Sequence, residues 1–258
     1  MSSEQRNVTK KENNLPTANL FEADAQNGLE NMDQQDLALP FLRILGQLSP
    51  QVNERDAKYV EGAKAGMIYN TVTSDLYDGV KGINVIPAYY KREYIEWQDR
   101  GEGAGAPVAV HSATSPIIQE TQRDSMGKDR LKNGNYLENT ASYFVIVCKD
   151  DSAETALITM KSTQLKVSRT WNSMMSGLKL QGKNGLFTPP MFSHVYNLKT
   201  VQQSNDKGTW FGWSVSKVGP VTNGGLYEQA KAFATSVKAG DVQAKHAKDE
   251  KSSEDTPF

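Results

Sequence analysis

The sequence predicts a mainly β protein of the α+β class, with one helix in the middle of the chain and another near its C-terminus. Runs of β-branched and aromatic residues separated by Gly, Asp and Asn fill residues 66–160 and predict several strands. Apolar residues recur at helical spacing over 162–178, and a strand–turn–strand pattern follows over 194–218. This order is typical of a small Greek-key barrel with a helix between its third and fourth strands, although other α+β folds share it.

The N-terminal part of the chain changes from polar to apolar. Residues 1–35 are rich in Asn, Gln, Glu, Asp and Lys, which predicts a flexible polar arm with a short helix near Leu29–Leu37. The first strongly apolar stretch, Leu39–Leu45, is expected to dock on the core as a short helix or strand. Ile83–Trp97 predicts a long strand in which Pro87 indicates an edge or a bulge.

The remaining elements follow from local patterns. The glycine loop 100–107 lacks the Gly-Lys-Ser/Thr of a phosphate-binding loop, and the polar stretch 119–135 predicts a basic surface loop. Two strands, a helix with Ser162 as its N-cap, a hairpin and a last helix are then expected over Ala141–Lys149, Thr155–Met160, Ser162–Leu178, His194–Val218 and Leu226–Lys238.

The predicted organisation has four parts. These are an arm over 1–35, an OB-fold-like core over 36–222, a C-terminal helix over 223–240, and a disordered acidic tail over 241–258 with a Pro-Phe tip. The predicted fold is thus an elaborated OB-fold-like Greek-key barrel with a mid-chain helix, a C-terminal helix and disordered ends.

Composition excludes several classes of protein. The longest apolar runs fall short of the roughly 18 residues of a membrane span, and the N-terminus lacks a signal peptide's apolar stretch, so host cytoplasm is expected. Cys148 is the only cysteine, and three scattered histidines show no metal-ligand spacing, so neither a metal nor another cofactor is expected. Neither a nucleophile elbow nor a paired catalytic set is present, which predicts a protein that is not an enzyme and has no small-molecule substrate.

Aromatic and basic residues alternate along the long strand. Because successive strand residues face opposite sides, Tyr90, Arg92 and Tyr94 share one face. Single-stranded DNA needs this mixture, since bases stack on aromatic rings while Lys and Arg follow the phosphates. We assign DNA contact to Tyr90, Arg92 and Tyr94, with Lys91 beside them, because the face that carries Ile95 and Trp97 resembles a core.

Two further clusters combine rings with cations. Trp210 and Trp213 lie near Lys199 across the predicted hairpin, and their opposite parity predicts that one is core and one exposed. Arg169 belongs to a group of cations around the mid-chain helix, which is either a solvated helix face or part of a DNA-binding surface. The net charge of −1 hides this distribution, because residues 249–258 hold four acids and one base and the rest of the chain has 28 basic and 26 acidic residues.

The acidic C-terminus ends in an apolar anchor. Glu254 and Asp255 precede Pro257 and Phe258, a combination that can dock in a basic-rimmed apolar pocket of a partner or compete with DNA for the protein's own basic groove. The alternative is a tail that only improves solubility.

Ser253–Phe258 resembles the C-terminal tip of bacterial single-stranded DNA-binding proteins, and phage proteins of the same role, such as those of T7-like viruses, also end in an acidic tail with a final aromatic residue. The body resembles phage-encoded single-stranded DNA-binding proteins in Leu39–Leu42 and in Tyr89–Tyr94. The acidic run here is weaker, since Lys251, Ser252 and Ser253 interrupt it. The resemblance implies an OB-fold, no catalysis, and recruitment of replication, recombination or transcription proteins.

We therefore expect non-catalytic binding and protection of single-stranded DNA during phage replication and recombination. Two alternatives stay open: a regulator of phage late transcription that activates transcription through host RNA polymerase, and a strand-annealing recombination protein.

Overall fold

The computed structural model describes residues 18–32, 36–99, 101, 105–150, 152–206 and 208–246, and it divides into two units, 1–37 and 38–258. In the first unit, helix α1 (Ala18–Ala23) is followed by turns that reach Asn31. The helix expected near Leu29–Leu37 is therefore wrong for residues 29–32, which form no helix, while 33–35 lie outside the described residues. Gln26 and Gly28, both at positive φ, favour turns over a continued helix in this stretch.

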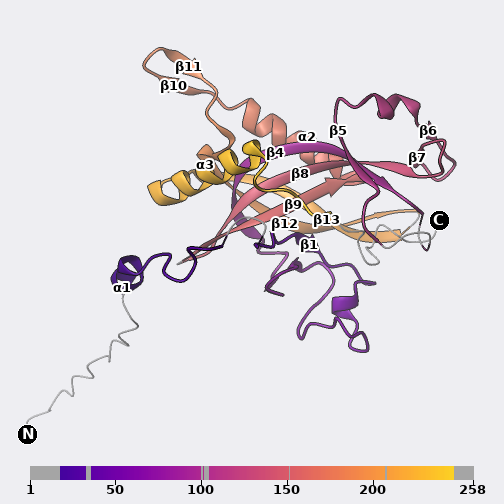
Figure 1. Cartoon of the computed structure of the whole chain (residues 1–258), viewed down its shortest axis with the longest axis horizontal. Coiled ribbons are helices and arrows are strands. Elements are labelled where there is room, and N and C mark those ends of the chain that lie inside the picture. The colour runs from indigo at the N-terminus through magenta and orange to yellow at the C-terminus, as the bar shows by residue number, and fades with distance from the viewer. Residues whose placement is uncertain are drawn as a thin grey trace, which may run out of the picture. The chain divides into compact units, whose positions relative to one another are not determined.

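The second unit is built on a curled antiparallel sheet of eight strands (Figure 1). Its central pair is β4 (Ile83–Trp97) and β8 (Tyr136–Cys148), which are paired along almost their whole length. β9 (Ala153–Lys161) lies outside β8, and β12 (His194–Asn205) lies on the other side of β4, followed by β13 (Gly208–Pro220). Three short strands lie where β4 ends and β8 begins. β5 (Ala109–Ser112) pairs with the last part of β4, β7 (Asp129–Arg130) pairs with the start of β8, and β6 (Gln122–Arg123) pairs with β7.

A small sheet joins the two sides of the curled sheet. It contains β1 (Leu42–Ile44), β2 (Ile68–Asn70) and β3 (Leu76–Tyr77). On one side, Phe41 forms a parallel bridge with Leu157 of β9. On the other side, the backbone N–H of Thr200 in β12 donates to the carbonyl of Gly79 at 2.8 Å. The main sheet is thus a half-barrel whose two sides are both in contact with the β1–β3 segment.

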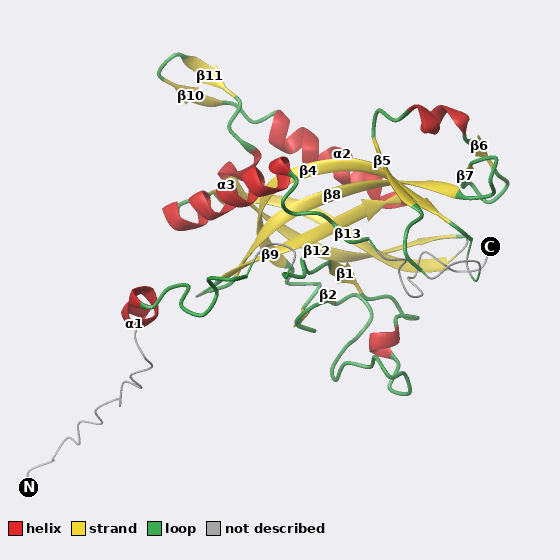
Figure 2. Ribbon diagram, in the orientation of Figure 1, coloured by secondary structure: helices red, strands yellow, loops and turns green. Residues whose placement is uncertain are grey.

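Two apolar cores lie on the two faces of the main sheet. The first contains the 3-10 turn and helix that follow β9, η3 (Ser162–Gln164) and α2 (Leu165–Ser176), whose Trp171 stacks on Tyr143 with ring centroids 4.2 Å apart. The second packs helix α3 (Gly224–Ala239) against Ile86, Phe144 and their neighbours. Asn223 caps α3 through its side chain, and Gly240 ends it in the left-handed conformation. Figure 2 shows the helices in red and the strands of the sheet in yellow.

The remaining described elements are short. β10 (Leu180–Gly182) and β11 (Gly185–Phe187) form a separate hairpin, and there are three further 3-10 turns, η1 (Pro50–Val52), η2 (Pro116–Glu120) and η4 (Met191–Ser193).

The sequence-based prediction of a mainly β, barrel-like fold is confirmed at this level. Pro87 marks a bulge, because the β4–β8 register shifts between Pro87 and Tyr89 where proline has no N–H to donate. Ser162 is not the N-cap of the helix, since its φ is +48° and α2 begins only at Leu165 with no side-chain cap.

Candidate nucleic-acid interface

β4 presents the predicted stacking residues on one face. The Tyr90 ring is half-buried against the first core, 5.0 Å from the Tyr143 ring. Arg92 is exposed, and its guanidinium lies 6.0 Å from the centroid of the half-buried Tyr94 ring. Arg92 and Tyr94 therefore offer a cation and a ring to solvent, whereas Tyr90 contributes to packing as well.

The opposite face of β4 begins with Lys91, which forms an ion pair with Glu93 at 3.1 Å. Glu93 is largely buried, and its pKa is lowered because contacts with His246 and Lys91 outweigh the rise that burial alone would cause. Lys91 therefore stands beside a carboxylate on the pocket side, away from Arg92.

The predicted contact residues of the β12–β13 hairpin differ in how far they are buried. Trp213 is 4% exposed in the first core, and its backbone N–H donates to the Gln164 side chain at 2.8 Å. A base has no access to that ring, so the assignment of Trp213 to DNA stacking is not compatible with its position. Trp210 is half-buried and donates from its indole to Gln203 at 3.0 Å, while Lys199 is exposed on β12.

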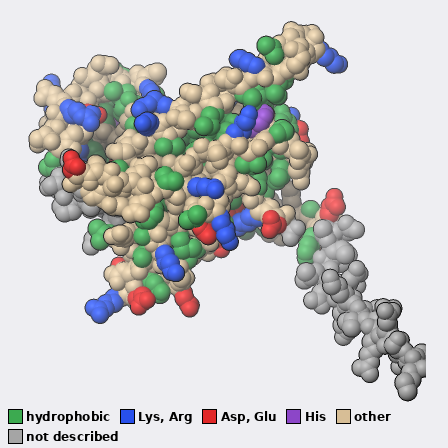
Figure 3. Space-filling model, turned by 180° about the vertical axis from the view of Figure 1, so that it is seen from behind, with side chains coloured by type: hydrophobic (Ala, Val, Ile, Leu, Met, Phe, Trp, Pro, Cys, Tyr) green, Lys and Arg blue, Asp and Glu red, His purple; other side chains and the backbone are tan. Residues whose placement is uncertain are grey.

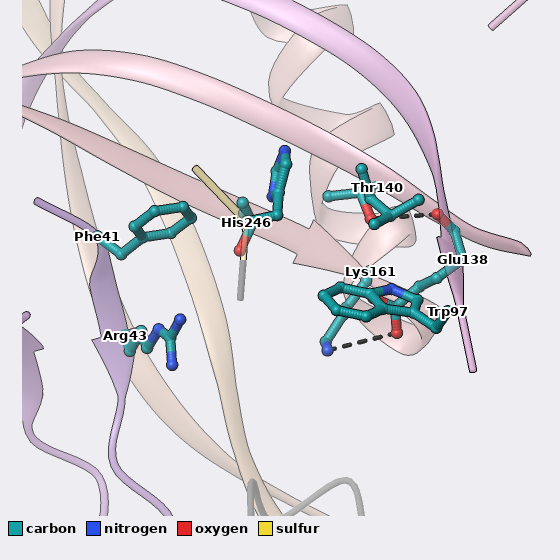
Figure 4. Close-up of a pocket in the computed structure, with 9 residues that line it drawn as sticks. Phe41, Arg43, Trp97, Glu138, Thr140, Lys161 and His246 are labelled. Atoms are coloured by element: carbon teal, nitrogen blue, oxygen red, sulfur yellow. Dashed lines mark hydrogen bonds and ion pairs between the residues drawn. The ribbon is translucent and has the colours of Figure 1, made fainter. Parts of the chain in front are cut away.

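A pocket on the second face of β4 joins residues that the sequence reasoning did not connect (Figure 4). It is lined by side chains from β1, β4, β8 and β9, from Phe41 before β1, and from the segment after α3: Phe41, Arg43, Ile95, Trp97, Glu138, Thr140, Thr159, Lys161 and His246. Its two aromatic rings, Phe41 and Trp97, are 8% and 5% exposed. Its cations are Arg43, 5.4 Å from the Phe41 ring, and Lys161, paired with Glu138 at 3.3 Å.

The segment that follows α3 contributes one residue, His246, to the lining of this pocket. The imidazole of His246 packs edge-on against Phe41 with centroids 6.0 Å apart, and its Nε2 lies 3.6 Å from a carboxylate oxygen of Glu93. Val242 is buried in the second core and fixes the start of the segment. Because the cavity that remains has room for about one water molecule, a larger ligand requires the His246 side chain to move.

The basic loop expected over 119–135 is largely neutralised. Arg130 contacts Asp99 at 2.8 Å and Asp124 at 2.7 Å, and these carboxylates raise its pKa. Lys128 pairs with Asp99 at 3.0 Å, and Arg123 with Asp129 at 3.2 Å. The loop was predicted to be a basic surface loop, and these three cations are paired with carboxylates.

Positive charge is concentrated in the segment that contains α2. Residues 155–205 include six Lys or Arg and not one Asp or Glu, a signal that the sequence analysis missed because it counted charge over the whole chain. Arg169, one of the predicted contact residues, is exposed on α2 within this segment, as is Lys166. Ring contacts connect α2 to β4: Trp171 of α2 stacks on Tyr143, and Tyr143 contacts Tyr90 of β4.

The predicted docking residues Glu254, Asp255, Pro257 and Phe258 lie outside the described residues. Burial raises the pKa of the half-buried Cys148 thiol, which disfavours the reactive thiolate. Within the described ranges, no group of three or more potential metal ligands occurs, and none of the helices has the length and apolarity needed to cross a bilayer.

The comparisons with known proteins point to a phage family. Residues 10–243 match the model of a family described as Pam3 phage gp34-like protein. No curated protein and no solved structure matches the chain. Because the family model covers most of the sequence, the chain belongs to the Pam3 phage gp34-like family.

Proposed function

We propose that this phage protein binds and protects single-stranded DNA without catalysis, in the cytoplasm of the host, during replication and recombination. The observation that carries the proposal is the pocket in which the rings of Phe41 and Trp97 lie beside Arg43 and Lys161. Both rings are covered in the structure, so in this proposal a base reaches them only after His246 and the segment that follows α3 have moved out of the pocket. Rings that stack on bases and cations that follow phosphates are the two elements of sequence-tolerant binding to a single strand.

The connectivity of the sheet supports an OB-fold type of barrel. The chain runs β4–β8–β9, then α2, then β12–β13, and the spatial order is β13–β12–β4–β8–β9. An OB-fold is a five-stranded Greek-key barrel that binds oligonucleotides on the face of its second and third strands. In this assignment β8 and β9 are the second and third strands, and both line the pocket.

The position of His246 supports a role for the tail in competition with DNA. His246 occupies the pocket, and Asp249 follows it by three residues, which span at most about 10 Å. Acidic side chains joined so closely to the pocket oppose the approach of phosphates. In this proposal the tip of the tail recruits replication, recombination or transcription proteins.

Titration of the full chain with oligo-dT at several salt concentrations tests the proposal. Binding should weaken with salt, and Arg43→Gln and Lys161→Gln should each lower the slope of log K against log salt by about 0.7, the value for one phosphate contact on a single strand. Lys231→Gln is a matched control, because Lys231 is exposed on α3 and pairs only locally with Glu228. Absence of binding at low salt would refute the proposed function. Equal slopes for all variants would show that Arg43 and Lys161 do not contact phosphates and that the binding site is not the pocket.

A further inference from the structure

A β-hairpin extends from the end of α2 beyond both cores. We call residues 177–190, with strands β10 and β11, the arm; in Figures 1 and 2 it projects past α2 and α3. Its strands pair only with each other. A two-stranded hairpin has little stability of its own, so this arm is not explained by a contribution to either core.

The arm exposes apolar side chains. Leu186 is 70% exposed, Phe187 47% and Leu180 37%. The Phe187 ring lies against Gly182, since a Cβ at that position would be only 3.0 Å from the ring. Glycine therefore leaves room for the ring beside the backbone, and the ring remains 47% exposed for a partner.

The charge of the arm selects a polyanion as that partner. The arm contains Lys179 and Lys183 and no acidic residue, and it belongs to the acid-free segment 155–205. Lys179 donates to Thr188 across the base of the arm, which fixes the ammonium there. Figure 3 shows Lys or Arg and apolar side chains together on the projecting arm, with no acidic side chain on the visible side.

We infer that the arm is a second contact for single-stranded DNA, in which Phe187 stacks on a base and Lys179 and Lys183 bind phosphates. This inference rests on the proposed function, because it extends the same bound strand beyond the barrel. An exposed ring beside two lysines fits unpaired bases with their phosphates better than an acidic protein surface, which lacks stacking partners.

Binding of the full chain to two fluorescent oligo-dT lengths, about 8 and about 40 nucleotides, tests the arm. An OB-fold occupies roughly 4–16 nucleotides, so the shorter strand can be held by the barrel alone. Phe187→Ala should weaken binding of the longer strand by about tenfold and leave the shorter unchanged, because one base stack is lost. Phe187→Trp should retain tight binding.

The lysines give an independent measurement. Lys179→Gln with Lys183→Gln should reduce the salt slope for the longer strand by about 1.4, from two phosphate contacts. The control is Lys231→Gln with Lys238→Gln, an equal charge change at two exposed lysines of α3. If the wild type binds both lengths and neither arm variant alters the longer one, the inference is overturned while the proposed function stands. If the wild type binds neither length, the proposed function is wrong and the inference falls with it. If the arm variants leave DNA binding unchanged but alter the oligomeric mass in sedimentation, the arm binds protein and the inference is wrong.

Discussion

Removal of residues 247–258 should strengthen binding to single-stranded DNA. This segment carries four carboxylates and two lysines, a net side-chain charge of −2, and it begins directly after His246 in the pocket. A phosphate that enters the pocket is repelled by this charge, because the three residues from His246 to Asp249 can place the first acidic residue no farther than about 10 Å from His246. The truncated chain ends in a carboxylate on His246, so the full-length variant without the four acidic side chains is the cleaner measurement of the effect.

The magnitude follows from Coulomb's law. Two unit charges 10 Å apart in water interact by about 0.4 kcal/mol, and 0.1 M salt reduces this to about 0.15 kcal/mol. Two net charges acting on roughly three phosphates therefore amount to about 1 kcal/mol, which is about a fivefold change in affinity. At 1 M salt, where the screening length is about 3 Å, the difference should vanish.

Fluorescence anisotropy with labelled oligo-dT at 0.05, 0.1 and 1 M salt, with protein in excess, measures the effect. A full-length variant with Asp249, Glu250, Glu254 and Asp255 changed to Asn or Gln is the control, because it removes charge and keeps length. A larger gain for the charge variant than for the truncation would support electrostatic competition, because the variant changes the side-chain charge by four and the truncation by two. Unchanged or weaker binding by both at low salt would refute the reasoning.

Three further predictions concern stability and pH. Trp171→Ala should lower the free energy of unfolding in urea by about 3–5 kcal/mol, because Trp171 is fully buried and stacks on Tyr143; a loss under 1 kcal/mol would contradict that packing. Gly79→Ala should lower the melting temperature by several degrees, since its Cβ would lie 1.9 Å from the Gly66 carbonyl oxygen, and an unchanged value would show that the loop adjusts. Burial raises the pKa of Glu96, but hydrogen bonds from Asn135, His111 and Asn133 outweigh this effect and lower the pKa below its ordinary value of 4.5. The contribution of Glu96 to folding stability is therefore present above pH 4.5 and is lost as the pH falls through the lower pKa of the folded state. Glu96→Gln should thus flatten the acid side of a plot of melting temperature against pH.

The long elements could be predicted from the sequence because their periodicity is strong. The strand 83–97 has the predicted bounds, and proline explains its one irregularity. The strands of the arm and of the loop 119–135 were missed, since two or three residues carry no measurable alternation. Ser162 shows the limit of capping rules: its residue type favours a cap, but it has a positive φ and is the first residue of a 3-10 turn.

The candidate site could be predicted only where one strand determines it. A period of two places Tyr90, Arg92 and Tyr94 on one face, but it does not tell which tryptophan of the hairpin is buried, because that depends on packing against α2 and Gln164. Phe41, Trp97 and His246 meet through a parallel bridge to β9 and through the return of the chain after α3. Neither contact leaves a local pattern in the sequence.

Lys161 connects the two surfaces that we assign to DNA. It lines the pocket at the end of β9, and the chain passes directly from it into η3, α2 and the arm. The cations beyond it, Lys166, Arg169, Lys179 and Lys183, follow with no intervening acidic residue. A strand that enters at the pocket can therefore meet Lys166 and Arg169 in the first half of α2 before it reaches Phe187. This continuity predicts an occluded length longer than one barrel face provides, and it would allow a chain with a net charge of −1 to bind a polyanion.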